Sequence, residues 1–377
     1  MAGLSMTIEA FLDGRLLVRE PVDVISSQSI KDIFKAFQFT SSVNLIVISS
    51  SEAQCEGVLD RSDGSQHIIF DLQSVRFSWD IFIAASHADS EVRQLLAIAA
   101  ISNLALLKSL NYPLPTITLA LLMRDFDHAL IAHVNNNDLS PPFKKDEWLY
   151  CQIAITIYLT AHESTHLDSG LFSTCPDIWS KMSDDLRVDA GLMGDNEYIQ
   201  KFYANQLADL INRHQIDCDI IAHKELVCDC VGINSVMDYI FSDNVPCENR
   251  RVVVLCLAAA IISNWASEIL TLRLNSFFED NECKYNNEID AAVLARCHCM
   301  AIYAVEEWLF RMKDAEEEKE YAAKLVDTVN ELIDNVDNGI EELFGSGAET
   351  AWRRAHALVS TNIIDLGRMQ DFILKNA

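Results

Sequence analysis

The sequence predicts a mostly α-helical protein with a small α+β portion at its N-terminus, on three observations. Half of the 377 residues are apolar, while only 12 are glycine and 7 are proline. Such a composition can bury a sizeable core and rarely interrupts a helix. Strand-like runs occur only before about residue 90, and long apolar segments with helical spacing follow them. We therefore divide the chain into residues 1–89, 90–312 and 313–377.

The N-terminal portion is predicted to be a small α+β unit. Ser29–Phe37 fits a short amphipathic helix. Val43–Ser49 is a β-branched run of the kind that forms a buried strand. Glu56–Leu59 and His67–Leu72 flank a turn rich in Asp, Ser and Gly, and this arrangement predicts a hairpin.

The middle portion is predicted to be a helical body. Its apolar residues recur at helical spacing, and Asn and Pro residues mark several of the helix ends. Lys144–Leu167 is apolar on most of its faces, so we expect this helix near the centre. The expected helices are Glu91–Leu110, Thr116–His133, Lys144–Leu167, Asp184–Met193, Tyr198–Arg213, Asp219–Phe241, Arg250–Leu274 and Glu288–Met312.

The C-terminal portion begins with the charged run Asp314–Glu320. Apolar residues at helical spacing follow, from Leu325 to Leu343. This pattern predicts acidic helices that pack on the body and turn their charged side to solvent. A dedicated docking surface is the alternative interpretation.

The net charge of −27, from 29 Lys and Arg against 56 Asp and Glu, limits the expected partners. Phosphate binding needs clustered Lys and Arg, so we expect neither nucleic acid nor an anionic membrane as a partner. The first residues contain no signal peptide, and apolar runs such as Val252–Ile262 are too short to span a bilayer. With 11 cysteines and no export signal, a cytoplasmic protein with free thiols is expected. The sequence indicates no particular oligomeric state.

The segment Thr160–Leu167 contains the pattern H-E-x-x-H, formed by His162, Glu163 and His166. Residues four apart on an α-helix lie on one face, one turn apart. Two imidazoles so placed can bind one Zn²⁺, and Glu163 can take a proton from the water that attacks a carbonyl. A chance match is the alternative, but two histidines and a glutamate at the end of an apolar helix are costly unless satisfied.

A catalytic zinc site needs a third protein ligand. The extended pattern HExxHxxGxxH fails, because Ser169 and Phe172 stand where Gly and His are required. Glu225 and Asp229 are better candidates, since they lie four residues apart inside an expected helix with apolar neighbours. Glu225 can ligate zinc, and Asp229 can accept the N–H of a ligand imidazole and fix its tautomer. An acidic pair on a solvated helix face is the alternative.

Together the two motifs resemble the gluzincin class of zinc metallopeptidases, in which HExxH is followed by a helix carrying ExxxD. Here they are His162–His166 and Glu225–Asp229, with Cys228 where that helix usually has alanine. The long gap between the motifs and the lack of a signal peptide are more similar to bacterial phage-exclusion-type intracellular peptidases than to secreted thermolysin relatives. The resemblance covers roughly residues 145–240.

The resemblance implies a zincin-like active-site helix within the helical body, with zinc held by His162, His166 and Glu225. Water would take the fourth place, and Glu163 would be the general base. The implied activity is that of a zinc metallopeptidase, with a protein or peptide as substrate. Because an intracellular peptidase must avoid indiscriminate proteolysis, we expect an endopeptidase of narrow specificity or a gated site.

Two further roles in such an enzyme stay open in the sequence. The group that stabilises the oxyanion is not identified, and His223, His214 and Tyr203 are candidates. Many such enzymes align the substrate backbone on an edge strand. His67–Leu72 is a candidate for this strand, although a plain hairpin strand explains the same residues.

Two other functions compete with the peptidase hypothesis. The first is a non-catalytic helical interaction protein in which the motif region is a structural or degenerate metal site. The second is a zinc hydrolase with a non-peptide substrate. Replacement of Glu163 separates the first from an enzyme, because a non-catalytic protein does not need that carboxylate.

Overall fold

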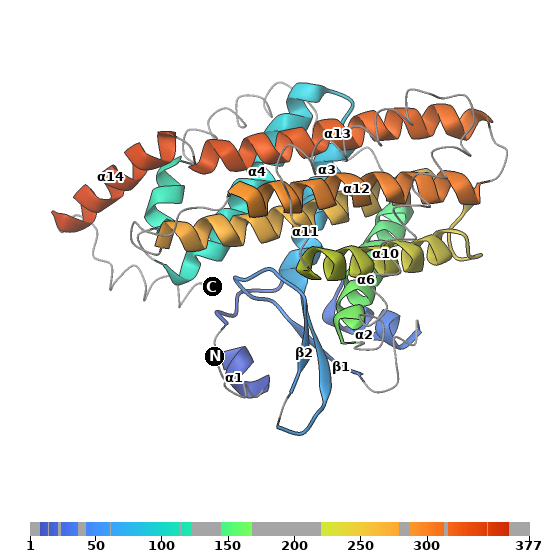
Figure 1. Cartoon of the computed structure of the whole chain (residues 1–377), viewed down its shortest axis with the longest axis horizontal. Helices are drawn as coiled ribbons and strands as arrows, with labels where there is room; N and C mark the ends of the chain where they lie inside the picture. Colours follow the sequence, from blue (N-terminus) through green and yellow to red (C-terminus); the bar gives the residue numbers. More distant parts are fainter. Residues whose placement is uncertain are drawn as a thin grey trace.

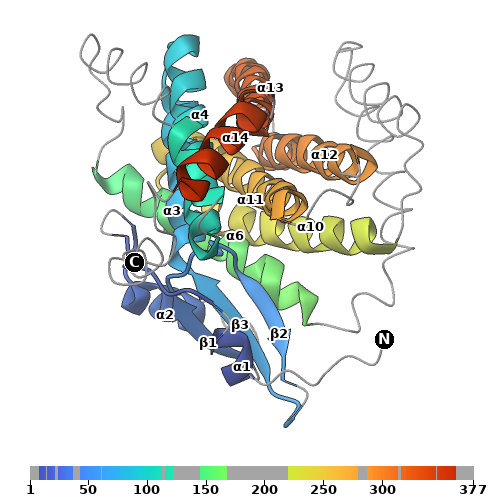
Figure 2. The same cartoon turned by 90° about the vertical axis from the view of Figure 1, so that its left-hand side faces the viewer.

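The computed structural model confirms a mostly helical protein with a small three-stranded sheet near the N-terminus (Figure 1). The sheet lies at one end of the molecule, below a body of long helices (Figure 2). The structure describes residues 8–13, 15–21, 24–36, 43–60, 62–112, 115–122, 145–167, 220–278, 287–312, 316–344 and 346–361.

The sheet has the order β1-β3-β2, with β1 at Val43–Ile48, β2 at Glu56–Leu59 and β3 at Gln66–Asp71. β1 and β3 are parallel, whereas β2 and β3 form an antiparallel hairpin. The register places Ile68 of β3 between Leu45 of β1 and Gly57 of β2. β3 is therefore the central strand, and β2 has a strand neighbour on one side only within the described residues.

The described helices include most of those that the sequence predicts. Two expected helices, Asp184–Met193 and Tyr198–Arg213, lie outside the described residues, as does the second half of Thr116–His133. The helices are α1 (Ile8–Asp13), α2 (Ser27–Ala36), α3 (Leu72–Ser86), α4 (Ser90–Lys108), α6 (Lys145–His166), α10 (Ile220–Ile240), α11 (Arg250–Phe278), α12 (Asn287–Arg311), α13 (Glu316–Phe344) and α14 (Ser346–Ser360), with 3₁₀ turns η1 (Ser109–Asn111) and η2 (Cys247–Asn249).

Helix α3 follows β3 without a break and is not among the helices that the sequence predicts. It is rich in aromatic and β-branched residues, so its apolar run cannot be told from the preceding strand by periodicity. The helix begins here because the Asp71 side chain accepts a hydrogen bond from the Gln73 N–H. It packs against α4 and α11, so this part of residues 1–89 contacts the helical body directly.

Helix α11 forms the centre of the body and packs against α3, α6, α12 and α13. The expectation that the apolar runs are too short to span a bilayer is wrong on length, because by length and composition alone α4 and α11 could each span a membrane. In α11, however, 78% of the most apolar stretch is buried inside the protein. Core helices pass the same test, so the apolar character of α11 is explained by its place in the core.

Helix α13 packs against α4, α11 and α12 along one apolar stripe. Its opposite side carries charged residues, among them the exposed pair Glu320 and Lys324. This amphipathic pattern matches a helix that covers one side of a core. The buried residues of the stripe are Leu325, Val329, Leu332, Val336, Ile340 and Leu343.

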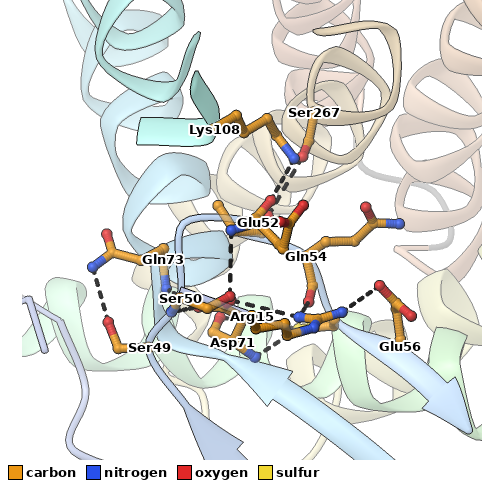
Figure 3. A network of polar contacts seen from close by, with 12 residues as sticks. Arg15, Ser49, Ser50, Glu52, Gln54, Glu56, Asp71, Gln73, Lys108 and Ser267 are labelled. Carbon is orange, nitrogen blue, oxygen red and sulfur yellow. Dashed lines mark hydrogen bonds and ion pairs between the residues drawn. The ribbon is translucent and has the colours of Figure 1, made fainter. Parts of the chain in front are cut away.

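A buried polar network holds the segment between β1 and β2 (Figure 3). Asp71 accepts hydrogen bonds from the Ser50 N–H at 3.2 Å and from the Ser50 hydroxyl at 2.5 Å. Arg15 lies 3.9 Å from Asp71 and pairs with Glu56, the first residue of β2. Because these groups are shielded from water, their mutual hydrogen bonds fix the position from which β2 begins.

Lys108, the last residue of α4, donates to the carbonyl of Glu52 in the same network (Figure 3). Burial lowers the pKa of its amine from 10.5 to about 8.

Between these two pKa values of Lys108 the unfolded chain binds more protons than the folded one, so the contribution of Lys108 to the free energy of unfolding rises with pH. Relative to Lys108→Met, we expect the wild-type free energy of unfolding to rise by up to about 1.4 kcal/mol per pH unit in this window. Urea denaturation of both proteins from pH 7.5 upward measures the difference in their free energies of unfolding. A difference that does not change with pH contradicts the expectation.

Candidate metal centre

The H-E-x-x-H motif lies at the C-terminal end of α6, a helix that is buried along most of its length. Tyr158 is fully buried, and His162 and Glu163 are only 3% and 7% exposed. The helix packs against α10, α11 and the strands β2 and β3. Its apolar residues therefore anchor it in the core and bring the polar motif to the boundary between the helices and the sheet.

Helix α10 carries Glu225 and Asp229 and packs against α6 (Figure 1). Gly232 allows this close approach, because a Cβ atom at this position would lie 2.7 Å from the ring of Tyr158. Glu225 and Asp229 are separated by one helical turn and thus face α6 together. The two predicted motif helices are neighbours in space although they are far apart in the sequence.

The donor atoms of His162, His166 and Glu225 converge on one point. The two Nε2 atoms are 3.3 Å apart; of the two Glu225 oxygens, Oε2 lies 3.3 Å from His162 Nε2 and Oε1 lies 3.5 Å from His166 Nε2. Nitrogen and oxygen ligands bind zinc at about 2.0–2.1 Å, so in a tetrahedral site they lie about 3.3 Å from one another. The three side chains therefore have the spacing of three ligands of a single tetrahedral ion.

Asp229 lies behind His162 and is 1% exposed. Its Oδ1 atom is 3.0 Å from His162 Nδ1 and accepts a hydrogen bond from the Tyr158 hydroxyl at 2.8 Å. Its Oδ2 atom accepts one from Nε of Arg296 on α12 at 2.9 Å. A carboxylate so placed could hold the proton of His162 on Nδ1 and leave Nε2 to face a metal, although Nδ1 makes no hydrogen bond of good geometry in the described structure.

Arg296 also connects two other carboxylates of the centre. Its guanidinium donates to Glu268 of α11 at 3.1 Å and lies 3.8 Å from Glu225. Neither Arg296 nor Tyr158 belongs to a sequence motif, so the sequence predicts a role for neither. The only signal for Arg296 is an arginine in the mostly apolar middle of α12, and an arginine that is buried there needs an acidic partner.

The pKa values in this centre reflect an excess of carboxylates. Burial alone would lower the pKa of His162, but Asp229 and Glu225 raise it to about 10. Burial opposes ionisation of Glu225, yet its contacts with His162 and His166 hold its pKa well below the usual range. The centre therefore attracts positive charge, and a divalent ion binding there would displace the proton of His162.

The sheet contacts the motif through backbone and side-chain hydrogen bonds. The N–H of Gly57 in β2 donates to Glu163 Oε2 at 2.8 Å, and Gln66 of β3 donates to the carbonyl of Leu167 at 2.9 Å. A Cβ at Gly57 would lie 2.6 Å from the carbonyl oxygen of Glu163, so only glycine permits this contact. Burial raises the pKa of Glu163 to about 6, although the two histidines oppose this shift.

Cys228 belongs to the same cluster. It is fully buried, and its Sγ and one nitrogen each of His162 and His166 all lie within 4.8 Å of one another. These three residues form a buried group that could hold a metal ion. Burial, together with the nearby Glu225 carboxylate, raises the pKa of the thiol. The sequence spacing already indicates this place for Cys228, because Cys228 follows Glu225 by three residues and therefore lies on the same helical face.

The structure thus brings together all five residues that the sequence singled out: His162, Glu163, His166, Glu225 and Asp229. The chemical role of each remains a prediction.

Other expectations have different outcomes. Of the oxyanion candidates, Tyr203 and His214 lie outside the described residues, as does the side chain of His223. His67–Leu72 is wrong as a candidate edge strand, because β3 pairs on both sides. Among the described strands, the edge strand beside Glu163 is β2, and its short length and its glycine make it hard to predict from the sequence.

Comparison of the chain with protein-family models, with curated proteins and with solved structures found no match. The function of the centre therefore rests on its own geometry.

Proposed function

We propose that the protein is a zinc-dependent metallopeptidase that hydrolyses peptide bonds within a protein or peptide substrate. The observation that carries the proposal is the convergence of His162, His166 and Glu225 at tetrahedral spacing beside the Glu163 carboxylate. Two imidazoles and one carboxylate are a ligand set of catalytic zinc, which keeps a fourth position for water or substrate.

Glu163 is the general base in this proposal. Bound zinc supplies polarisation of the scissile carbonyl and lowers the pKa of water to about 7. Glu163 accepts the proton of the attacking water and then delivers it to the leaving amine. Its hydrogen bond from Gly57 holds one carboxylate oxygen in place and leaves the other to receive the proton. Asp229 keeps His162 in the tautomer that ligates through Nε2.

The position of β2 supports a peptide as the substrate. The Gly57 N–H donates to Glu163, so the side of β2 opposite to β3 faces the centre. An extended peptide that adds to this side of the sheet would pass beside Glu163. Strand addition binds the middle of an extended chain and leaves both ends free, which favours an endopeptidase.

Mass spectrometry of cleavage products in H₂¹⁸O tests the proposal. The zinc-loaded protein is incubated under reducing conditions with a mixture of unfolded proteins, and new termini are identified. We expect new carboxyl termini that carry ¹⁸O, and none with Glu163→Gln. Identical products from both proteins, or no products from the zinc-loaded wild type and its Cys228→Ala variant, would contradict the proposal.

A non-catalytic metal protein is the second candidate, and the place of Cys228 favours it. Cysteine ligands are frequent in structural zinc sites, which have four protein ligands and no open position. Under that function, the Glu163→Gln and wild-type proteins would bind zinc equally and neither would cleave peptides.

A further inference from the structure

The position of Cys228 is not explained by a three-ligand catalytic site. Its side chain is fully buried and shares the face of α10 that presents Glu225 to α6. Its neighbour on the same helix, Cys230, is buried elsewhere, with its Sγ 3.8 Å from Met300 Sδ on α12. One cysteine of the pair is thus directed at the histidines and the other is packed in the core.

The Sγ atom of Cys228 is close enough to bind the same ion as the histidines. Zinc–sulfur bonds are about 2.3 Å long, so a thiolate and an imidazole on one tetrahedral ion lie about 3.5 Å apart. The observed separations from His162 and His166 are at most 4.8 Å. Rotation about the single side-chain torsion of cysteine can move Sγ by more than the difference between the observed separations and those expected on one ion.

We infer that Cys228 is a fourth metal ligand, which closes the centre in the resting protein and makes it latent. The inference rests on the proposed function for the metal and deepens it by naming how the site is regulated. Two imidazoles, one carboxylate and one thiolate fill a tetrahedral ion, so no place is left for the attacking water. With a metal bound, Cys228 would have to leave it and take up a proton before a water could approach beside Glu163.

This arrangement gives a physical reason for restrained activity. The resting site resembles a structural site in its ligand number, and it becomes catalytic only when Cys228 moves away. A substrate or partner that shifts α10 relative to α6 can exchange the thiolate for water. No separate inhibitory segment is needed, because the gate is one side chain of the metal-binding helix.

Cobalt substitution tests the inference with a signal that does not depend on activity. Thiolate ligation of Co²⁺ gives a near-ultraviolet charge-transfer band that imidazole and carboxylate ligands do not give. We expect this band in the wild type and in Cys230→Ala, and its loss in Cys228→Ala and Cys228→Ser. We also expect zinc affinity to fall at least about tenfold in both Cys228 variants, and peptide cleavage by them to exceed that of the wild type.

The outcomes separate this inference from the proposed function. Stoichiometric cobalt binding to the wild type without the band overturns the role of Cys228 and leaves the three-ligand peptidase intact. A band that persists in Cys228→Ser has the same consequence, because another thiol must then bind the ion. A wild-type protein that binds neither cobalt nor zinc overturns both. The wild-type spectrum is informative even if a variant fails to fold.

Discussion

Glu163→Gln is expected to retain its metal and to lose peptide-bond cleavage by about 10²–10⁴-fold. Glutamine has nearly the same shape as glutamate, and its side-chain oxygen can still accept the hydrogen bond that Gly57 donates at 2.8 Å. The amide cannot accept a proton from water, so the loss falls on the chemical step. Steady-state cleavage of a peptide identified by mass spectrometry, with zinc content measured on the same samples, gives both quantities.

The pair of measurements distinguishes the role of Glu163 from a structural role. A variant that loses zinc together with activity shows that the carboxylate supports the metal or the fold. A variant that keeps both shows that the reaction does not use Glu163, which contradicts the proposed mechanism. Glu331→Gln is a suitable control, because Glu331 pairs with Arg93 on the distant contact between α4 and α13.

The second large effect is expected from His162→Ala, which should abolish stoichiometric zinc binding. The substitution removes one proposed ligand, and with it the imidazole whose Nδ1 lies 3.0 Å from Asp229 Oδ1. Asp229 keeps its hydrogen bonds from Tyr158 and Arg296, so we expect the fold to persist. Cleavage activity should fall to background even in excess zinc.

Zinc titration with a competing chromophoric chelator measures this effect, and circular dichroism checks the fold. His356→Ala is the matched control, because His356 is an exposed histidine on α14. Unchanged zinc affinity in His162→Ala would exclude His162 as a ligand and contradict the assignment of the centre.

The sequence was sufficient to predict the residues of the centre that follow helical periodicity. His162 and His166, like Glu225 and Asp229, are four apart, and that spacing places each pair on one face before any tertiary contact is known. The meeting of the two helices depends on packing. It could be expected only because buried polar groups in apolar helices need partners.

Residues that act through tertiary contact could not be predicted in this way. Arg296 and Gly57 approach the motif from elements that are distant in the sequence, and neither belongs to a recurring pattern. Helix α3 was missed for a related reason, because its first residue directly follows a buried strand of similar composition. Cys228 stands where the resembling helix usually has alanine, but only the folded structure places its thiol near the histidines.

X-ray absorption at the zinc edge tests the central claim most directly, because it reports the ligands of the bound ion. We expect about one zinc per chain in the resting wild type, with two imidazoles and an oxygen ligand at about 2.0–2.2 Å and a sulfur ligand at about 2.3 Å, and markedly weaker zinc binding in Glu225→Ala. Six oxygen ligands without imidazole scattering, or a zinc affinity that Glu225→Ala leaves unchanged, would contradict the convergence of His162, His166 and Glu225 on one ion.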